Sequence, residues 1–285
     1  MSFPVHSMLP IVAIQGFEGC FHQIAARRHF GPQVAVLPCA TFGEVVRSVV
    51  SGAAGAAVMA IENSIAGSIL PNYTLLRKAG LRVVGEVYLH IRQHLMALPG
   101  QQLLDIKEVH SHPMALLQCA DYLGQYPHWK LVETEDTALS AQRIREQQRP
   151  GVAAVAGQLA AELFDLDIVA GDIHEEQHNY TRFLVLMRAE DAPLQYHPTK
   201  ASLYFEAPHA IGSLARILTA VAGQGVNLSK LQSCPQPGRT WHYFFHADLE
   251  FAAPAQLDET LAALAPLTEG LQLLGAYRRE LNDER

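Results

Sequence analysis

The stretch IVAIQGFEGCFHQIAARRHF, residues 11–30, decides the fold class of this chain. Its first four residues form a short apolar run that is typical of a buried strand. Gly16 and Gly19 bracket a turn, and the residues after Gly19 are predicted to form a helix up to Phe30. A buried strand that turns directly into a helix is the repeating unit of α/β proteins.

The same alternation continues to about residue 190, which indicates an α/β fold with a mostly parallel sheet. A β-rich segment is predicted at 82–98, and Ser111-His112-Pro113 has the cap and first-turn residues that open a helix. The remaining predicted strands are 34–37, 56–61, 130–132, 152–155 and 182–187, and the remaining helices are 41–50, 70–79, 136–147 and 158–164.

A second domain is predicted after residues 189–198, a stretch with two prolines and no periodicity that is typical of a linker. The order beyond it is βαββαβ, which is the ferredoxin-like split unit. Its predicted elements are strand 202–206, helix 211–222, strands 226–232 and 240–250, helix 255–264 and strand 271–276.

Composition excludes several classes of function. The net charge of -7 and the lack of a Lys or Arg run argue against a nucleic-acid partner. No apolar stretch approaches the roughly 20 residues that span a membrane, and residues 1–6 lack the pattern of a signal peptide. The four cysteines are widely separated, which predicts reduced thiols and a cytoplasmic protein.

Residues 174–178, HEEQH, match the zinc-binding pattern H-E-x-x-H letter by letter. That pattern binds zinc only on a helix, where both histidines share one face. Here the five residues lie between an extended run and a strand, so we predict a loop and no metal site. Neither G-x-G-x-x-G nor a P-loop occurs, so a nucleotide cofactor has no support.

Small polar residues mark three strand-to-helix junctions, at 16–20, 62–68 and 111–113. Ligands of open α/β sheets bind where strands end and helices begin. Free amides at helix N-termini attract anions, so these junctions are candidate sites for carboxylates. Cys20 begins one of these helices, where a thiol can become nucleophilic, although a buried and inert cysteine is the favoured interpretation.

Four stretches in this order resemble the signatures of the prephenate dehydratase family, and the resemblance covers nearly the whole chain. GFEGCFH is similar to G-P-x-G-[ST]-[FY]-[ST], IENSIAGS to I-E-N-S-x-x-G-S, SHPMALLQC to S-H-P-x-x-x-x-Q-C, and NYTRF to N-x-T-R-F. They occupy residues 16–22, 61–68, 111–119 and 179–183.

The resemblance implies a catalytic domain over 8–190 and an ACT regulatory domain over 200–280. In this family the catalytic domain is a pair of α/β lobes like a periplasmic binding protein, with the active site between them. Lobe 1 would comprise about 8–84 and 168–188, and lobe 2 about 85–167.

The implied reaction is the decarboxylative dehydration of prephenate to phenylpyruvate, without a cofactor. Thr181 would protonate the departing hydroxyl, and because its own hydroxyl is a weak acid, geometry matters more than pKa. Period-two geometry puts Arg182 on the other face of the strand, so it is either a carboxylate partner or a structural support. The other substrate-binding residues that the resemblance implies are Gly19, Cys20, Glu62, Asn63, Ser64, Gly67, Ser68, His112, Asn179 and Phe183.

The resemblance further implies control by phenylalanine, which binds between two paired ACT domains, so a homodimer or homotetramer is expected. Cys20 and His22 replace hydroxyl residues of the first signature, and Gln232-Ser233-Cys234-Pro235 replaces the family's E-S-R-P. The implied phenylalanine-binding residues are Gly212, Ser213, Leu214, Asn227, Leu228, Gln232 and Ser233.

Two alternatives remain open at the level of sequence. Arogenate dehydratases share these motifs, and no residue settles the choice between the two substrates. A non-catalytic amino-acid sensor would also combine two lobes with an ACT domain. Thr181 argues against the sensor, because binding alone does not require a proton donor at that position.

Overall fold

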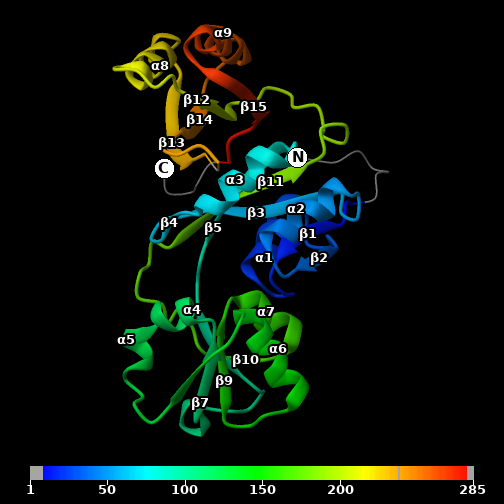
Figure 1. Cartoon of the computed structure of the whole chain (residues 1–285). Coiled ribbons are helices and arrows are strands. Elements are labelled where there is room, and N and C mark those ends of the chain that lie inside the picture. Colours follow the sequence, from blue (N-terminus) through cyan, green and yellow to red (C-terminus); the bar gives the residue numbers. More distant parts are fainter. Residues whose placement is uncertain (1–8, 237, 281–285) are drawn as a thin grey trace.

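The computed structural model describes residues 9–236 and 238–280, and within them three β-sheets define lobe 1, lobe 2 and a C-terminal domain. Figure 1 shows lobe 2 at the bottom, lobe 1 in the middle and the C-terminal domain at the top. Residues 1–6, for which no signal peptide is expected, lie outside the described residues. No helix in the described part of the chain is long and apolar enough to cross a membrane.

Lobe 1 is built on a sheet of order β2-β1-β3-β11-β5, with β4 beside β3. β1 lies between β2 and β3, and three residues of the apolar run 11–14, Val12, Ala13 and Ile14, are fully buried there, as an apolar run predicts. Its elements are β1 (Val12–Gln15), α1 (Phe21–Phe30), β2 (Val36–Cys39), α2 (Phe42–Val50), β3 (Ala56–Asn63), β4 (Gly67–Ser68), α3 (Leu70–Ala79), β5 (Arg82–His90) and β11 (Tyr180–Met187).

Lobe 2 is built on a sheet of order β10-β6-β9-β7-β8, flanked by short helices. Its most buried strand is β9, whose five residues are all small or β-branched. The elements are β6 (His94–Ala97), η1 (Leu103–Asp105), β7 (Glu108–Ser111), α4 (Pro113–Leu117), α5 (Ala120–Leu123), β8 (Lys130–Glu133), α6 (Thr137–Gln147), β9 (Val152–Ala156), α7 (Gln158–Phe164) and β10 (Asp167–Ala170).

Both sheets are mixed, which corrects the expectation of mostly parallel sheets. β1 pairs in parallel with β2 and β3, but β11 runs antiparallel to both β3 and β5. The reason is the path of the chain: β3 and β5 run toward lobe 2, and β11 returns from it at the same end. In lobe 2, β6 likewise runs antiparallel to β9 and β10.

The crossings between the lobes also lie later in the chain than expected. β5 pairs with β11 up to His90, so the chain leaves lobe 1 after His90 and not near residue 84. β10 pairs with β6 of lobe 2, so the return segment is 171–179 and does not begin at 168. The first shift arises because β5 is a long strand that continues to the lobe boundary, and the second because β10 is an edge strand of the lobe 2 sheet.

The C-terminal domain has the predicted βαββαβ order, arranged as an antiparallel sheet β13-β14-β12-β15. Alternation along β12 gives the sheet two buried faces: Leu203 and Phe205 pack in a cluster with the helices, whereas Lys200 and Ser202 face lobe 1. The elements are β12 (Lys200–Glu206), α8 (Ser213–Gly223), β13 (Asn227–Pro235), β14 (Tyr243–Glu250), α9 (Pro254–Leu264), η2 (Ala265–Leu267) and β15 (Glu269–Tyr277).

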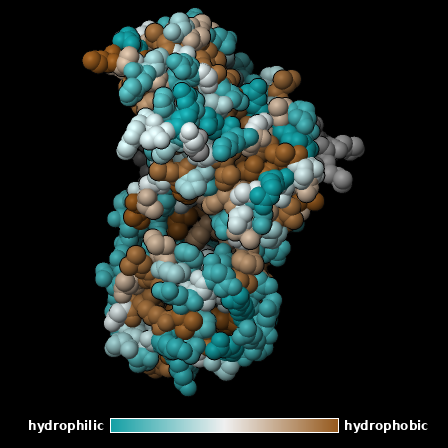
Figure 2. Space-filling model, viewed as in Figure 1, coloured by the Kyte–Doolittle hydropathy of each residue, from teal (hydrophilic) through white to brown (hydrophobic). Residues whose placement is uncertain are grey.

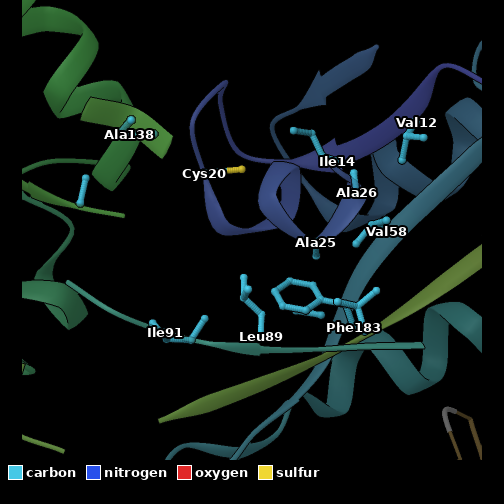
Figure 3. Packing of buried hydrophobic residues seen from close by; sticks show 14 of the residues in the cluster. Val12, Ile14, Cys20, Ala25, Ala26, Val58, Leu89, Ile91, Ala138 and Phe183 are labelled. Atoms are coloured by element: carbon cyan, nitrogen blue, oxygen red, sulfur yellow. The ribbon is translucent and has the colours of Figure 1, made fainter. Parts of the chain in front are cut away.

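One apolar cluster joins the two lobes. It includes Cys20, Ala25 and Phe183 from lobe 1 together with Ala138 and Ala160 from lobe 2. Figure 3 shows the Phe183 ring beside Leu89, with Cys20 pointing from the turn before α1 and Ala138 on the lobe 2 side. A second cluster joins lobe 1 to the C-terminal domain through residues such as Tyr73 and Phe244.

Gly275 of β15 lies very close to the backbone of lobe 1. A Cβ atom built at this position would lie 1.9 Å from the Val83 carbonyl oxygen of β5. That separation is far shorter than van der Waals contact, and the obstacle is backbone, which does not move aside as a flexible side chain does. A side chain here would therefore push the two domains apart.

We predict that Gly275→Ala lowers the unfolding temperature and costs about 1–3 kcal/mol of stability, as overpacking does in well-packed cores. Gly223→Ala is the matched control, because nothing lies within 4 Å of a Cβ atom at that position in α8. Thermal unfolding of both variants measures the difference. An unchanged melting temperature for Gly275→Ala would show that the two domains are not packed this closely.

Candidate active site

A cavity of about 370 Å³ lies between lobe 1 and lobe 2. Figure 2 shows a recess with hydrophobic residues at its floor between the lower and middle parts of the molecule. Lobe 1 contributes the end of β1, the start of α1 and the facing ends of β3 and β11. The lining residues are Gln15, Cys20, Phe21, His22, Phe42, Ala60, Asn63, Ala66, Ile69, Ile91, Gln93, His112, Met114, Ala115, Gln118, Glu135, Asp136, Thr137, Thr181 and Phe183.

The starts of three helices border this cavity. Cys20, His112 and Asp136 are the N-cap residues of α1, α4 and α6 and all three line the cavity. Asp136 Oδ1 accepts from the amide of Leu139 at 2.9 Å, and burial raises the pKa of Asp136. The start of α1 has no side-chain cap. Helix N-termini attract anions, so this start is a candidate position for a carboxylate of a bound substrate.

Asn63 and Thr181 form the polar pair at the centre of the lobe 1 wall. They are directly opposite each other in the β3–β11 ladder. Asn63 Nδ2 donates to Thr181 Oγ1 at 3.0 Å, while Asn63 Oδ1 accepts from the amides of Ile65 and Ala66 at 3.0 and 2.9 Å. Because these amides fix the orientation of Asn63, Thr181 Oγ1 is an acceptor in this bond and keeps its own proton for another partner.

His22 and Cys20, which replace the hydroxyl residues of the first signature, are both neutral. Burial lowers the pKa of His22 to about 4, and its Nε2 accepts from the amide of Ala60 at 3.4 Å. The His22 ring packs edge-on against Phe183 at 5.0 Å between ring centroids. Burial raises the pKa of Cys20 to about 12, so its thiol stays protonated at neutral pH.

Of the substrate-binding residues that the sequence suggested, the structure brings Cys20, Asn63, His112, Thr181 and Phe183 to the cavity wall. The others lie behind the wall or beside it.

Two of the remaining residues support the central pair. Asn179 Oδ1 accepts from Asn63 Nδ2 at 2.7 Å. Ser64 Oγ donates to the carbonyl of His178 and accepts from the amide of Tyr180, each at 2.9 Å. These bonds tie the end of β3 to the segment that leads into β11.

Gly19 lies where lobe 1 meets α7 of lobe 2, and a Cβ there would be 3.1 Å from Ala160 Cα, so only glycine fits without displacement. Gly67 and Ser68 form β4 beside the end of β3. All three are positioned to shape the surroundings of the cavity and do not line it.

Arg182 and Glu62 lie on the opposite face of their strands and point away from the cavity. Arg182 donates from Nε to Glu86 at 2.8 Å and from Nη1 to Asp248 of the C-terminal domain. Lys230 of the C-terminal domain forms an ion pair with Glu62. The expectation that both residues contact the substrate is therefore corrected, because both form contacts between domains. Of the two roles that remained open for Arg182, carboxylate partner or structural support, the structure shows the second.

Residues 174–178 lie in the loop between β10 and β11, as predicted. Glu175 accepts from the amide of Asp121 at 2.7 Å, and His174 is buried beside the first interlobe crossing, where its Nδ1 accepts from the amide of Gln93. In the described residues, no group of three or more His, Cys, Asp or Glu side chains is placed to hold a metal ion.

The sequence reasoning missed most of the other cavity residues, including Gln15, Gln93, Gln118 and Asp136. Gln15 and Gln93 lie at a strand end and in the first interlobe crossing, and no motif points to either. Gln118 belongs to the third signature but was not chosen. Asp136 carried a usable signal, because an acidic residue directly before a predicted helix is an N-cap at a further strand-to-helix junction.

The phenylalanine-binding residues suggested by the sequence are divided between two places. Ser213 and Leu214 line a cavity of about 330 Å³ in the C-terminal domain, and Gly212 precedes them in a left-handed conformation with φ +75°. Asn227, Leu228, Gln232 and Ser233 lie along β13 and do not line this cavity.

The fold is a two-lobed α/β unit with a cavity between its lobes, followed by a ferredoxin-like βαββαβ domain. The chain belongs to the prephenate dehydratase family, because the model of that family matches residues 12–191. Similar proteins include a bifunctional chorismate mutase/prephenate dehydratase of Enterobacter agglomerans, 31% identical over 96% of this chain and 72% of the relative. An arogenate dehydratase/prephenate dehydratase of Arabidopsis thaliana is 33% identical over 95% of this chain and 72% of the relative.

Two solved structures support the same assignment of fold. Prephenate dehydratase of Arthrobacter aurescens in complex with L-Phe has a TM-score of 0.82 and 29% identity, over 94% of this chain and 90% of that one. GqqA, described as a novel type of quorum quenching acylase, has a TM-score of 0.84 and 32% identity, over 95% and 98%.

We predict that His22 stays neutral through the physiological range and takes a proton only near pH 4. Its folded pKa of about 4 lies below the value of about 6.5 expected in the unfolded chain. Above pH 6.5 both states are neutral and His22 has no effect. As the pH falls from 6.5 toward 4, the unfolded state binds the proton first, so stability declines.

NMR titration of the imidazole resonances measures this pKa, and His22→Gln identifies which resonance belongs to His22. The variant keeps an acceptor for the Ala60 amide and should show a shallower loss of stability between pH 6.5 and 4. A His22 resonance that titrates near pH 6.5 would contradict the prediction.

Proposed function

We propose that this chain is a carbon–oxygen lyase that converts prephenate to phenylpyruvate. The observation that carries the proposal is the Asn63–Thr181 pair, held by backbone amides in the wall of a cavity between two lobes. Membership of the prephenate dehydratase family supports the choice of substrate.

In the reaction, the bond between the ring and its carboxylate breaks and carbon dioxide leaves. The electron pair of that bond passes into the ring, and the carbon–oxygen bond at the opposite ring position breaks. Thr181 gives its proton to the departing hydroxyl, which leaves as water. Aromatisation of the ring supplies the driving force, and solvent returns a proton to Thr181.

Asn63 has a specific part in this step. When Thr181 releases its proton, negative charge develops on Oγ1, and Asn63 Nδ2 is already directed at that atom at 3.0 Å. A donor that is fixed before the reaction stabilises charge as it develops without reorganising. The start of α1 at Cys20, which has no side-chain cap, is placed to attract a carboxylate of the substrate.

The relative described as a quorum quenching acylase raises a second activity for the same cavity. Covalent acyl transfer needs a nucleophile with a base beside it. The Cys20 thiol, with a pKa of about 12, stays protonated, and His22 Nε2 already accepts from Ala60. Dehydration needs no such nucleophile, so we favour the dehydratase.

Arogenate remains a candidate substrate, since several relatives are named arogenate dehydratases. Arogenate differs from prephenate by an amino group in place of the keto oxygen. Assays with each compound, followed by ultraviolet absorption of the aromatic product, distinguish the two activities.

We predict that Thr181→Val folds normally and loses roughly 10² to 10⁴ in turnover, the range for one general acid. Valine matches the shape of threonine without its hydroxyl, and Thr181→Ser should retain a large part of the activity because it keeps the proton donor. Formation of phenylpyruvate from prephenate measures turnover, and circular dichroism measures folding.

Thr219→Val is the control for the chemical change alone, because Thr219 lies on α8 and donates only to the carbonyl of Ala215 within that helix. A folded Thr181→Val variant with near-normal turnover would overturn the role of Thr181. An inactive wild-type protein with both prephenate and arogenate would overturn the proposed function itself.

We propose that phenylalanine binds to the C-terminal domain and inhibits the enzyme. A solved relative was determined with L-Phe, and Ser213 and Leu214 line a cavity of the C-terminal domain here. β13 is at the edge of its sheet in the described chain, so a second copy could complete the site there, and we propose a homodimer or homotetramer.

We further propose that the protein works in the cytoplasm. All four cysteines are free and buried, which suits a reducing compartment.

We predict that phenylalanine raises the apparent KM several-fold, because allosteric coupling is typically about 1–3 kcal/mol. Gly212→Val should abolish this effect while leaving turnover without phenylalanine unchanged, since a β-branched residue is strained at φ +75°. The whole chain is required, because removing the C-terminal domain near Pro193 would leave Arg182 without Asp248.

Calorimetry with phenylalanine on wild type and Gly212→Val measures binding directly. The absence of binding to the wild-type protein at millimolar phenylalanine would contradict the prediction. Gly223→Ala, in the same helix but remote from the cavity, should bind as wild type does.

A further inference from the structure

At the ends of β3 and β11, two pairs of residues lie on opposite faces of the lobe 1 sheet. Thr181 lies opposite Asn63 in the ladder, and Arg182 lies opposite Glu62. Because side chains alternate along a strand, the first pair faces the cavity and the second pair faces the C-terminal domain. The two pairs are neighbours on the same two strands, so a displacement of the backbone at one pair also displaces the other.

The C-terminal domain supplies an oppositely charged partner for each residue of the second pair. Asp248 of β14 pairs with Arg182. Lys230 of β13 pairs with Glu62 and donates to Ser68 Oγ of β4 at 2.8 Å. Both contacts join the C-terminal domain to the ends of the strands that carry Thr181 and Asn63.

The ladder between β3 and β11 is interrupted just before these two pairs. Phe183 pairs with Ala60, but Arg182 pairs with Glu62, so Ile61 has no counterpart and the register shifts. A bulge locally disrupts the ladder and bends the strand. The strand ends beyond the bulge therefore depend more on side-chain contacts than the continuous part of the sheet does.

We propose that Lys230 and Asp248 are positioning residues for the Asn63–Thr181 pair. By holding Glu62 and Arg182, the C-terminal domain fixes the two strand ends that aim the Thr181 hydroxyl at the substrate. The effect on catalysis rests on the proposed function. On this proposal, the C-terminal domain supports the geometry of the active site even when no regulatory ligand is bound.

Lys230 is the better residue to test. The Asp248 side chain is fully buried against Arg182. Its removal would leave Arg182 and Lys200 to share Glu86 in a buried site, which endangers folding. Lys230 and Glu62 keep 17% and 31% of their side-chain surface exposed, so water can reach Glu62 when Lys230 is replaced. Lys230→Met keeps the aliphatic chain and removes the charge.

Lys230→Met should lower kcat by about tenfold with little change in KM, because misplacement of a catalytic group by a fraction of an ångström slows chemistry. Lys230→Arg should restore a large part of kcat. The matched control is Arg82→Met: it also removes a contact between the same two domains, Arg82 Nη1 to the Leu273 carbonyl at 2.9 Å, but at the far end of β5. Its kcat should equal that of wild type.

A double-mutant cycle tests whether Lys230 acts through Glu62. If it does, Lys230→Met combined with Glu62→Gln should lose no more kcat than Lys230→Met alone, because the second change removes a contact that is already broken. Additive losses would instead mean that Lys230 acts by another route and would overturn the proposal.

Hydrogen–deuterium exchange gives a readout that does not depend on activity. In Lys230→Met, the amides of 61–66 and 179–183 should exchange faster than in wild type, while those of β9 in lobe 2 should not change. If wild type dehydrates neither prephenate nor arogenate, the proposed function fails, and exchange alone still decides whether Lys230 holds these strand ends. Unchanged exchange in Lys230→Met, or in Lys230→Gln if the first variant does not fold, would overturn the proposal.

Discussion

The buried ion pairs of Arg182 are the contact on which the arrangement of the domains depends. Burial opposes the charge of this guanidinium, but Asp248, Tyr277 and Glu86 hold the pKa of Arg182 well above its usual range. Lys200 donates to Glu86 at 2.9 Å and also forms an ion pair with Glu250, so Arg182 and Lys200 lie together with three carboxylates between lobe 1 and the C-terminal domain. Removing one would leave the others uncompensated, which is costly in a buried site.

The local elements of this fold could be predicted from the sequence, but the directions of its strands could not. The strand at 11–14 and the βαββαβ order both follow from local periodicity, and both are present. The antiparallel entry of β11 between β3 and β5 depends on where the chain crosses between lobes, which no local pattern encodes. The same limit explains why the lobe boundary was placed near residue 84, inside a strand that continues to His90.

The candidate site was predictable where a motif and a strand end coincide, as at Asn63 and Thr181. Glu62 and Arg182 belong to the same motifs but point the other way, because alternation along a strand sends neighbours to opposite faces. The sequence predicted this orientation for Arg182 and left two roles open, carboxylate partner or structural support. It could not choose between them, because the deciding partner, Asp248, lies 66 residues further along the chain in another domain.

A reaction driven by aromatisation needs neither a strong acid nor a nucleophile from the protein, and the residues of the cavity are consistent with such a reaction. His22 and Cys20 are neutral there. The proton donor that we propose, Thr181, is a weakly acidic hydroxyl, so its effect depends on the direction in which it points. When the reaction rate depends more on the orientation of the proton donor than on its acidity, a small displacement of β11 is enough to change the rate. A domain that holds the reverse face of that strand can therefore control the reaction without contacting the substrate.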